Sequence, residues 1–249
     1  MIKYPCKLTR TRSGNNERGY TMKKAIIFKT IADAKRSAKA AGYHISDGNK
    51  KLKPNNHTGF IVWNLPAVMT CPYATKNCIK FCYARKAEKA YPDCLPARMD
   101  NFNRSRDPET FITFMSSYIA TIAEKGKKAE YIIRIHESGD FYNKTYVNAW
   151  LEIIRRVNAT TKKVKFIAYT KSFRFFDGVK LPRNFYLRAS IWDDTKPEDL
   201  ETIRRNEWSI YTAVDQFRTG DTFTRCRCSD CATCGKCWSR RHDIRCEIH

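Results

Sequence analysis

The sequence lacks a run of about 18 apolar residues, the length that a membrane-spanning helix requires. Its N-terminus, MIKYPCKLTRTRSGNN, lacks the apolar segment of a secretory signal peptide. No repeat of fixed period and no low-complexity tract is visible. We therefore expect a cytosolic protein with no membrane partner. Hydrophobic residues make up 42% of the 249 residues, enough to fill a sizeable core.

Acidic residues are scarce, since 25 Asp and Glu stand against 47 Lys and Arg, a formal net charge of +22. The imbalance is steepest over residues 1–58, which hold 14 Lys and Arg and only 3 Asp and Glu. A basic arm of this kind favours a polyanionic partner, most simply nucleic acid. The alternative is a solvated surface that keeps the protein soluble.

Eleven cysteines in a chain without a secretory signal indicate metal binding more than disulfides, because the cytosol keeps thiols reduced. Eight of them fall in two tight groups. We expect Cys6, Cys94 and Cys246, which stand apart, to be buried thiols or spare ligands. The first group is Cys71, Cys78 and Cys82, and the second is Cys226, Cys228, Cys231, Cys234 and Cys237.

Strand and helix patterns alternate along the chain, which predicts an α/β fold with a parallel sheet and helices outside it. Four or five such units would form a partial (β/α) barrel at 59–220. A small basic α+β extension at 1–58 would precede the barrel, and a Cys-rich metal-binding tail at 221–249 would follow it. The expected strands are 59–66, the start of 131–141, 163–172, 185–192 and 208–215, besides short ones near residue 25 and before His249. The expected helices lie within 25–45, from Cys82 to about Ala90, and at 108–126, 144–157 and 196–205.

Unusual residues follow four successive expected strands, and in parallel α/β folds function gathers in such loops. They are the cysteine loop and the segments 136–140, 170–172 and 192–194.

The cysteine loop, CPYATKNCIKFCYARK, places three cysteines in twelve residues. Four thiolates would close a structural zinc site, whereas three leave one coordination position open. One alternative is a zinc ion whose fourth ligand is Cys94 or a histidine. Another is a group of buried, unpaired thiols.

The loop resembles that of radical S-adenosylmethionine enzymes, in which three cysteines after the first strand of a partial (β/α) barrel hold a 4Fe-4S cluster. Phe81 stands where an aromatic residue usually precedes the third cysteine, although the spacing C-x6-C-x3-C is longer than the common C-x3-C-x2-C. In that superfamily the open iron is chelated by S-adenosylmethionine, and one electron cleaves the sulfonium to give a 5′-deoxyadenosyl radical. The resemblance implies a 4Fe-4S cluster, S-adenosylmethionine and an electron donor.

A closer resemblance covers about residues 60–249, where several motifs look like those of the phage gene product 88 family. That family is mostly described as radical-S-adenosylmethionine-like, and a phage protein would work in the bacterial host cell. The motifs are, in order, CPYATKNC with CYA, RIHESGDFY, FIAYTKS, LRASIWDD and CATCGKCW.

The end of the second strand is where radical S-adenosylmethionine enzymes bind the ammonium of their cofactor. The residues that stand in that place are Glu137, Ser138, Gly139 and Asp140. A carboxylate suits an ammonium group, and a glycine lets the backbone approach a ligand closely. For Asp140 the alternative is a cap for the helix that begins near Lys144.

Later strand ends offer further cofactor contacts. Lys171 and Ser172, then Arg188 and Ser190, would meet the carboxylate and ribose of the cofactor. The alternatives are a surface lysine and an ordinary polar strand face. His136 is equally consistent with a core histidine.

The C-terminal group, from Cys226 to Cys237, resembles the tight C-x2-C-x2-C run of ferredoxins. It predicts either a second iron–sulfur cluster or a zinc ion that folds the tail. Basic residues surround it, so a cationic metal-containing surface against nucleic acid is a further expectation.

Together these features predict a radical S-adenosylmethionine-like 4Fe-4S enzyme that acts on nucleic acid or a nucleotide. The main alternative is a zinc-stabilised nucleic-acid-binding protein without catalytic activity. A third hypothesis is a barrel that keeps a cluster but has lost radical chemistry.

Overall fold

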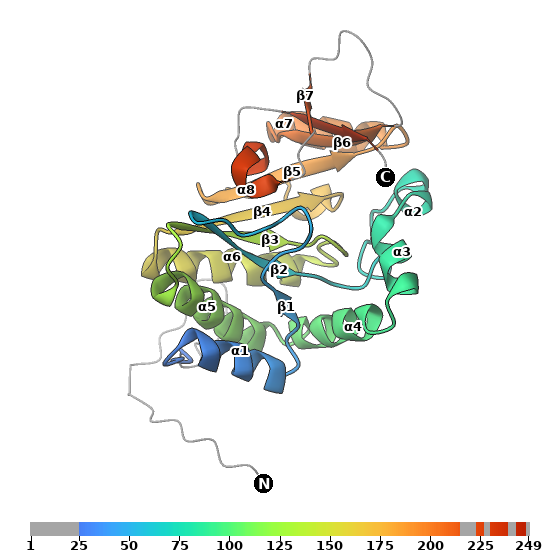
Figure 1. Cartoon of the computed structure of the whole chain (residues 1–249). Coiled ribbons are helices and arrows are strands. Elements are labelled where there is room, and N and C mark those ends of the chain that lie inside the picture. The colour runs from blue at the N-terminus through green and yellow to red at the C-terminus, as the bar shows by residue number, and fades with distance from the viewer. Residues whose placement is uncertain (1–24, 215–222, 227–229, 239–242, 248–249) are drawn as a thin grey trace.

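The structure is a computed structural model that describes residues 25–214, 223–226, 230–238 and 243–247 (Figure 1). These residues form a mixed α/β fold on one eight-stranded sheet, in the order β1-β2-β3-β4-β5-β6-β8-β7. Only β1 runs antiparallel to its neighbour, and the other described pairings are parallel. The strands are β1 (Ile45–Ser46), β2 (Thr58–Trp63), β3 (Glu130–Ile135), β4 (Val164–Thr170), β5 (Phe185–Ile191), β6 (Ile210–Val214), β7 (Thr224–Arg225) and β8 (Ile244–Glu247).

The longest helices begin at side-chain caps that the sequence provides. Asp107 and Asn143 each accept a hydrogen bond from the backbone N–H three residues later. No helix among the described residues is long and apolar enough to cross a membrane. The helices are α1 (Ile31–Ala40), α2 (Lys76–Lys80), α3 (Tyr83–Ala90), α4 (Cys94–Ser105), α5 (Pro108–Lys125), α6 (Lys144–Thr160), α7 (Pro197–Arg205) and α8 (Cys231–Cys234), with 3-10 turns at η1 (Phe173–Phe175) and η2 (Lys236–Trp238).

Both faces of the sheet are buried. Alternate strand residues such as Ile61 and Ile133 pack with α5 and α6 in the main core. Residues of opposite orientation, such as Phe60 and Ile132, form a smaller cluster with residues of α8 and η2. Strands buried on both faces read as continuous apolar runs, which is why 59–63 is apolar throughout.

The mixed α/β class and the mostly parallel sheet are confirmed. The strands expected at 59–66, 163–172 and 185–192 correspond to β2, β4 and β5, with small differences at their ends. The expected strand near residue 25 is wrong, because residues 25–30 are not in a strand and the N-terminal segment instead contributes β1. The sequence did not predict α4, which accommodates Pro96 in its first turn.

The described part of the expected N-terminal extension shares the main core. Ala34 and Ala38 of α1 are buried in it, and the ring of Tyr43 stacks on Phe114 with centroids 4.0 Å apart. Residues 1–24, which carry much of the basic arm, lie outside the described residues. The division into 1–58, 59–220 and 221–249 stays a prediction.

Candidate metal and cofactor site

Hydrogen bonds join the end of β2 to the end of β3. The side-chain oxygen of Asn64 accepts from the backbone N–H groups of Glu137 (2.7 Å) and Ser138 (3.1 Å). The Leu65 N–H donates to the Ser138 carbonyl over 2.9 Å, and the Ser138 hydroxyl donates to the Leu65 carbonyl over 2.8 Å. The Ser138 hydroxyl, which we expected to bind the cofactor, therefore donates to the backbone at the start of the cysteine loop.

Gly139 lets the cysteine loop lie close to the end of β3. Its φ is +84°, and an added Cβ would lie 2.6 Å from Leu65 Cβ and 2.6 Å from Thr70 Oγ1. Sequence reasoning expected this glycine to admit a close ligand. The close neighbour that the structure places there is the chain itself.

Glu137 links two more segments to this strand end. Its carboxylate accepts from the side chain of Asn49, and its carbonyl accepts from the Tyr83 hydroxyl. Asn49 precedes β2 and Tyr83 begins α3, so both flanks of the cysteine loop meet here. Glu137 is half-buried, and its carboxylate accepts from Asn49.

The three loop cysteines come from three local elements. Cys71 closes a turn after β2, Cys78 lies in α2, and Cys82 is the N-cap of α3. Burial, then the charges of Asp140, Cys78 and Cys82, raise the pKa of the Cys71 thiol to about 12. Charges act this strongly only at short range, so the three thiols share one region.

A buried lysine faces the same region. Lys171 is only 8% exposed, and its Nζ donates to Ser190 Oγ over 2.7 Å and to the sulfur of Cys78. Burial raises the pKa of Cys78, and the ammonium of Lys171 opposes that rise. The alternative of a surface lysine is therefore wrong. Lys171 and Ser190, both expected at the cofactor, lie beside the cysteine loop.

Asp140 fixes the backbone from which Lys171 extends. Its carboxylate accepts from the Thr170 hydroxyl over 2.6 Å and from the Lys171 backbone N–H over 2.8 Å. Burial raises the pKa of Asp140, and these hydrogen bonds oppose the rise. The cap of α6 is Asn143, which accepts from the Tyr146 N–H, so the alternative that Asp140 caps this helix is wrong.

The helix that carries Cys78 docks on the loop after β5. The Phe81 and Trp192 rings stack with centroids 5.7 Å apart. The Asn77 backbone N–H donates to Asp194 over 2.8 Å, and its side chain donates to Asp193 over 2.7 Å. Sequence reasoning singled out 192–194 as an unusual strand end but missed its partner Asn77. No local pattern could have found that pairing, because it joins residues 116 positions apart.

The residue types in this region fit a thiophilic metal, since three thiols lie together beside a cation that would stabilise their thiolate forms. Their sulfurs do not converge on a single point in the structure. Among the described residues, no group of three or more His, Cys, Asp or Glu has the arrangement that holds a metal ion.

A closed zinc site with Cys94 as fourth ligand requires Cys94 to lie near Cys82, and the structure places α3 between them. Cys82 caps the start of α3, and Cys94 follows its end and begins α4. The eight residues of α3 span about 12 Å, so Cys94 and Cys82 lie at opposite ends of this helix. His136 is buried with its Nε2 2.8 Å from the Tyr146 hydroxyl, and burial lowers its pKa to about 3. It is a core histidine, as the alternative expected.

Two of the C-terminal cysteines lie on the face of the sheet away from α5 and α6. Cys231 and Cys237 pack against the smaller apolar cluster. Burial raises the pKa of Cys231 to about 11, and the charges of Cys237, Cys226 and Cys234 act in the same direction. Cys228 lies outside the described residues. The structure thus brings several of these cysteines together, as a second group separate from the cysteine loop.

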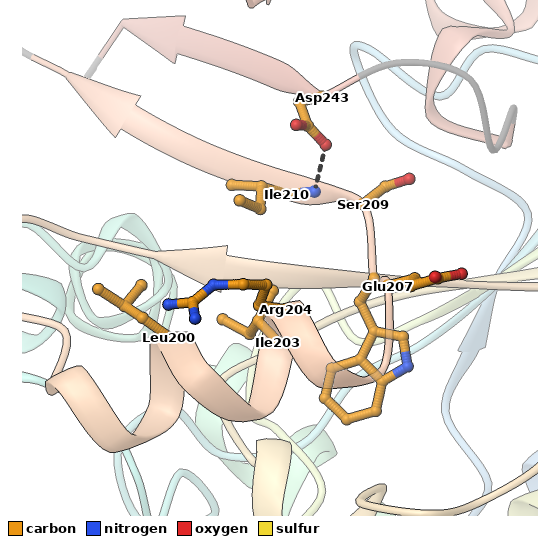
Figure 2. Close-up of a pocket in the computed structure, with 8 residues that line it drawn as sticks. Leu200, Ile203, Arg204, Glu207, Ser209, Ile210 and Asp243 are labelled. Atoms are coloured by element: carbon orange, nitrogen blue, oxygen red, sulfur yellow. Dashed lines mark hydrogen bonds between the residues drawn. The ribbon is translucent and has the colours of Figure 1, made fainter.

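A hollow of about 500 Å³ lies elsewhere, between the end of α7 and the start of β6 (Figure 2). Leu200 and Ile203 supply part of its apolar wall, and Asp243 accepts from the Ile210 N–H over 2.7 Å. Because β6 begins here, the hollow lies at the amino end of the strands. None of the predicted metal or cofactor residues lines it.

Comparison with known proteins gives matches within a single family. The family model described as Gene product 88 matches residues 36–240. The Gene 88 protein of Mycobacterium phage D29 is 37% identical over 199 residues, which cover 70% of this chain and 80% of the relative. The Gene 88 protein of Mycobacterium phage L5 is 36% identical over 106 residues, 41% of this chain and 43% of the relative. No solved structure matches significantly. The extent of the family match and the identity to the D29 protein place this chain in the Gene product 88 family of phage proteins.

Proposed function

We propose that the protein is a radical S-adenosylmethionine-like iron–sulfur enzyme on a partial (β/α) barrel, in which Cys71, Cys78 and Cys82 ligate a 4Fe-4S cluster. One observation carries the proposal. The thiol of Cys78 contacts Lys171, which donates to Ser190, and the thiols of Cys71 and Cys82 lie near that of Cys78. These residues stand at the carboxyl ends of parallel strands, where α/β folds build their sites. A 4Fe-4S cluster held there, with S-adenosylmethionine bound, would supply the single electron that radical chemistry requires.

In this proposal the surrounding residues have different roles in binding S-adenosylmethionine. Lys171 would bind the cofactor carboxylate by a charge-assisted hydrogen bond, and Ser190 would offer a hydroxyl to the ribose. Asp140 holds the Lys171 backbone in place, because it accepts from that N–H. Glu137 carries the carboxylate for the cofactor ammonium, and Gly139 sets how closely the cysteine loop approaches.

Two further components complete the proposal. The C-terminal cysteines hold a second metal centre, either an iron–sulfur cluster or zinc. The first cluster would require an electron donor in the host cell cytoplasm.

The test is metal analysis of protein purified without oxygen. We expect iron and sulfide, and a low-temperature electron paramagnetic resonance signal of the reduced protein that shifts when S-adenosylmethionine is added. The Cys71→Ala, Cys78→Ala, Cys82→Ala triple variant should lose the shifting signal. Cys94→Ala is the matched control and should keep it. Zinc without iron in the wild-type protein would contradict the proposal.

A basic, aromatic surface favours a second candidate function, that of a zinc-stabilised nucleic-acid-binding protein. Segment 76–91 exposes two tyrosines, Tyr83 at 57% and Tyr91 at 67%. Its one acidic residue, Glu88, bonds to Arg98 over 2.8 Å. Tyrosine rings stack on bases and basic side chains contact phosphates, so the combination suits single-stranded nucleic acid. The exposed basic residues of the segment are Lys76, Lys80, Arg85, Lys86 and Lys89.

Nucleic-acid binding by this segment is also compatible with the enzyme, because the basic segment includes part of the cysteine loop. Nucleic acid bound there would lie next to the proposed cluster as its substrate. Iron content together with cleavage of S-adenosylmethionine separates the enzyme from a binding protein, and from a barrel that keeps a cluster without radical chemistry.

A further inference from the structure

Cys246, which stands alone in the sequence, lies next to the C-terminal cysteine group in the fold. In the parallel pair β7 and β8, Arg225 is opposite Arg245, so Cys226 and Cys246 occupy the next position in register. The Cys226 N–H donates to the Arg245 carbonyl over 2.7 Å, which continues the ladder to this point. Neighbouring strands lie about 4.8 Å apart and side chains in register share a face, so the two thiols are neighbours.

Two tyrosine hydroxyls donate to sulfurs of this group. The Tyr211 hydroxyl lies 2.8 Å from the Cys246 sulfur. Tyr169, whose ring packs edge-on against Tyr211 with centroids 4.6 Å apart, donates to the sulfur of Cys237. Hydrogen bonds of this kind orient thiolate ligands and stabilise their charge. Cys246 and Cys237 therefore have the same kind of hydrogen-bond donor, a tyrosine hydroxyl.

Two arginines on the same face add positive charge to this group. The Arg134 guanidinium lies 3.7 Å from the centre of the Tyr169 ring, and its buried Nε has no hydrogen-bond partner. Arg188 is 1% exposed and donates to the Cys237 carbonyl over 2.7 Å. A buried guanidinium is costly unless negative charge lies near it. Arg188 also donates to the Lys236 carbonyl over 3.1 Å, so its guanidinium is held against the segment that carries Cys237.

We propose that Cys246 completes a four-thiolate metal centre with Cys226, Cys231 and Cys237, and that Arg134 and Arg188 balance its charge. Four thiolates around zinc or around a 4Fe-4S cluster leave a net charge of about −2, which two guanidinium groups offset. Metal binding draws the sulfurs to one point, which they do not share in the structure. The inference rests on the second metal centre of the proposed function and not on the radical chemistry.

The experiment isolates this centre in the Cys71→Ala, Cys78→Ala, Cys82→Ala background. Zinc, iron and sulfide per chain identify the metal, and competition with a chelator gives its affinity. Adding Cys246→Ser should lower that affinity at least 10-fold, whereas adding Cys94→Ser should leave it unchanged. If the metal is zinc, cobalt can replace it. The intensity of the cobalt–thiolate charge-transfer band should then fall by about a quarter in Cys246→Ser, since one of four thiolates is lost.

Unchanged affinity in Cys246→Ser, with loss in Cys228→Ser or Cys234→Ser, would overturn the ligand assignment. Absence of metal from the background protein would overturn the centre itself. Neither outcome touches the first cluster, whose signal is measured in a Cys226→Ser, Cys231→Ser, Cys237→Ser variant with the cysteine loop intact. Circular dichroism of each variant verifies that it is folded.

The charge balance has a separate test. Arg134→Met should lower metal affinity about 10-fold in the same background. Arg156→Met is the matched control, because Arg156 is also largely buried but pairs with Glu152 on α6. Equal affinities in the two variants would overturn the role of Arg134.

Discussion

Gly139 is the residue at which one added methyl group would most directly disturb the candidate site. Gly139→Ala would place a Cβ 2.6 Å from atoms of Leu65 and Thr70 at a φ of +84°. Strain from positive φ costs about 1–2 kcal/mol and overpacking about 1–3 kcal/mol, so we expect the free energy of unfolding to fall by about 2–5 kcal/mol. Urea denaturation measures this change.

Gly178→Ala is the control, because Gly178 also has positive φ but would place its Cβ in open space. It should cost only about 1 kcal/mol, the strain alone. Similar losses in the two variants would mean that the cysteine loop yields to the methyl group and that Gly139 is not needed for its close approach.

His136 makes stability depend on pH. Burial, with the charge of Arg134, lowers its pKa from 6.5 to about 3. Between these values the unfolded chain binds one more proton than the folded protein, so stability falls as pH falls below about 6.5. Each pH unit costs about 1.4 kcal/mol, which amounts to about 2 kcal/mol between pH 7 and pH 5.

His136→Asn should remove this part of the pH dependence, because asparagine does not titrate and tolerates the φ of +67° at this position. Urea denaturation at pH 7, 6 and 5 gives the slope. His44→Asn changes a histidine that is half-exposed beside Asp100, and it should keep the wild-type loss. If His136→Asn lost as much stability as wild type between pH 7 and pH 5, another group would be responsible.

At the scale of elements, α2 is held by a few polar bonds and one ring stack rather than by buried apolar residues. None of its five residues is buried. Asn77→Ala removes the side-chain bond to Asp193 and should speed backbone hydrogen exchange in α2 about 5- to 10-fold, as the loss of one hydrogen bond predicts. Asn103→Ala on the exposed side of α4 should leave this exchange unchanged. Equal rates in both variants would show that the Asn77 N–H bond to Asp194 and the Phe81–Trp192 stack hold α2 without the side-chain bond to Asp193.

The sequence predicted elements well where apolar periodicity was strong and long, as in α5, α6 and the buried strands. It also placed the unusual residues at strand ends that the parallel register brings together. It could not predict β1, whose two residues pair with β2 only through tertiary contacts. Nor could it show that Cys246 joins the C-terminal group, because strand register and not spacing in the chain places it there.

The sequence predicted which residues lie at the candidate site better than it predicted what each of them does there. Lys171 and Ser190 lie at the cysteine loop, as expected from their strand ends. Ser138 and Gly139 instead hold the end of β3 close to the cysteine loop. This role depends on how closely Leu65 and Thr70 pack against them, which no sequence motif encodes.

At the scale of the whole molecule, the formal charge of +22 makes nucleic-acid binding testable by salt dependence. If segment 76–91 contacts phosphates, replacing Lys80, Arg85 and Lys89 with glutamine removes up to three ion contacts. The magnitude of the slope of log affinity against log salt should then fall by up to about 2, and affinity at low salt should fall at least 10-fold. Fluorescence anisotropy with a labelled single-stranded oligonucleotide at several salt concentrations measures both.

The control removes the same three positive charges near the opposite, amino ends of the strands. Lys125, Lys127 and Lys162 are exposed near the amino ends of β3 and β4, away from the cysteine loop. Their replacement with glutamine should change the slope little, because a defined surface and not total charge carries the contacts. Equal effects of the two triple variants would mean that the charge acts diffusely, as a solvated basic surface does, and segment 76–91 would then have no special part in binding.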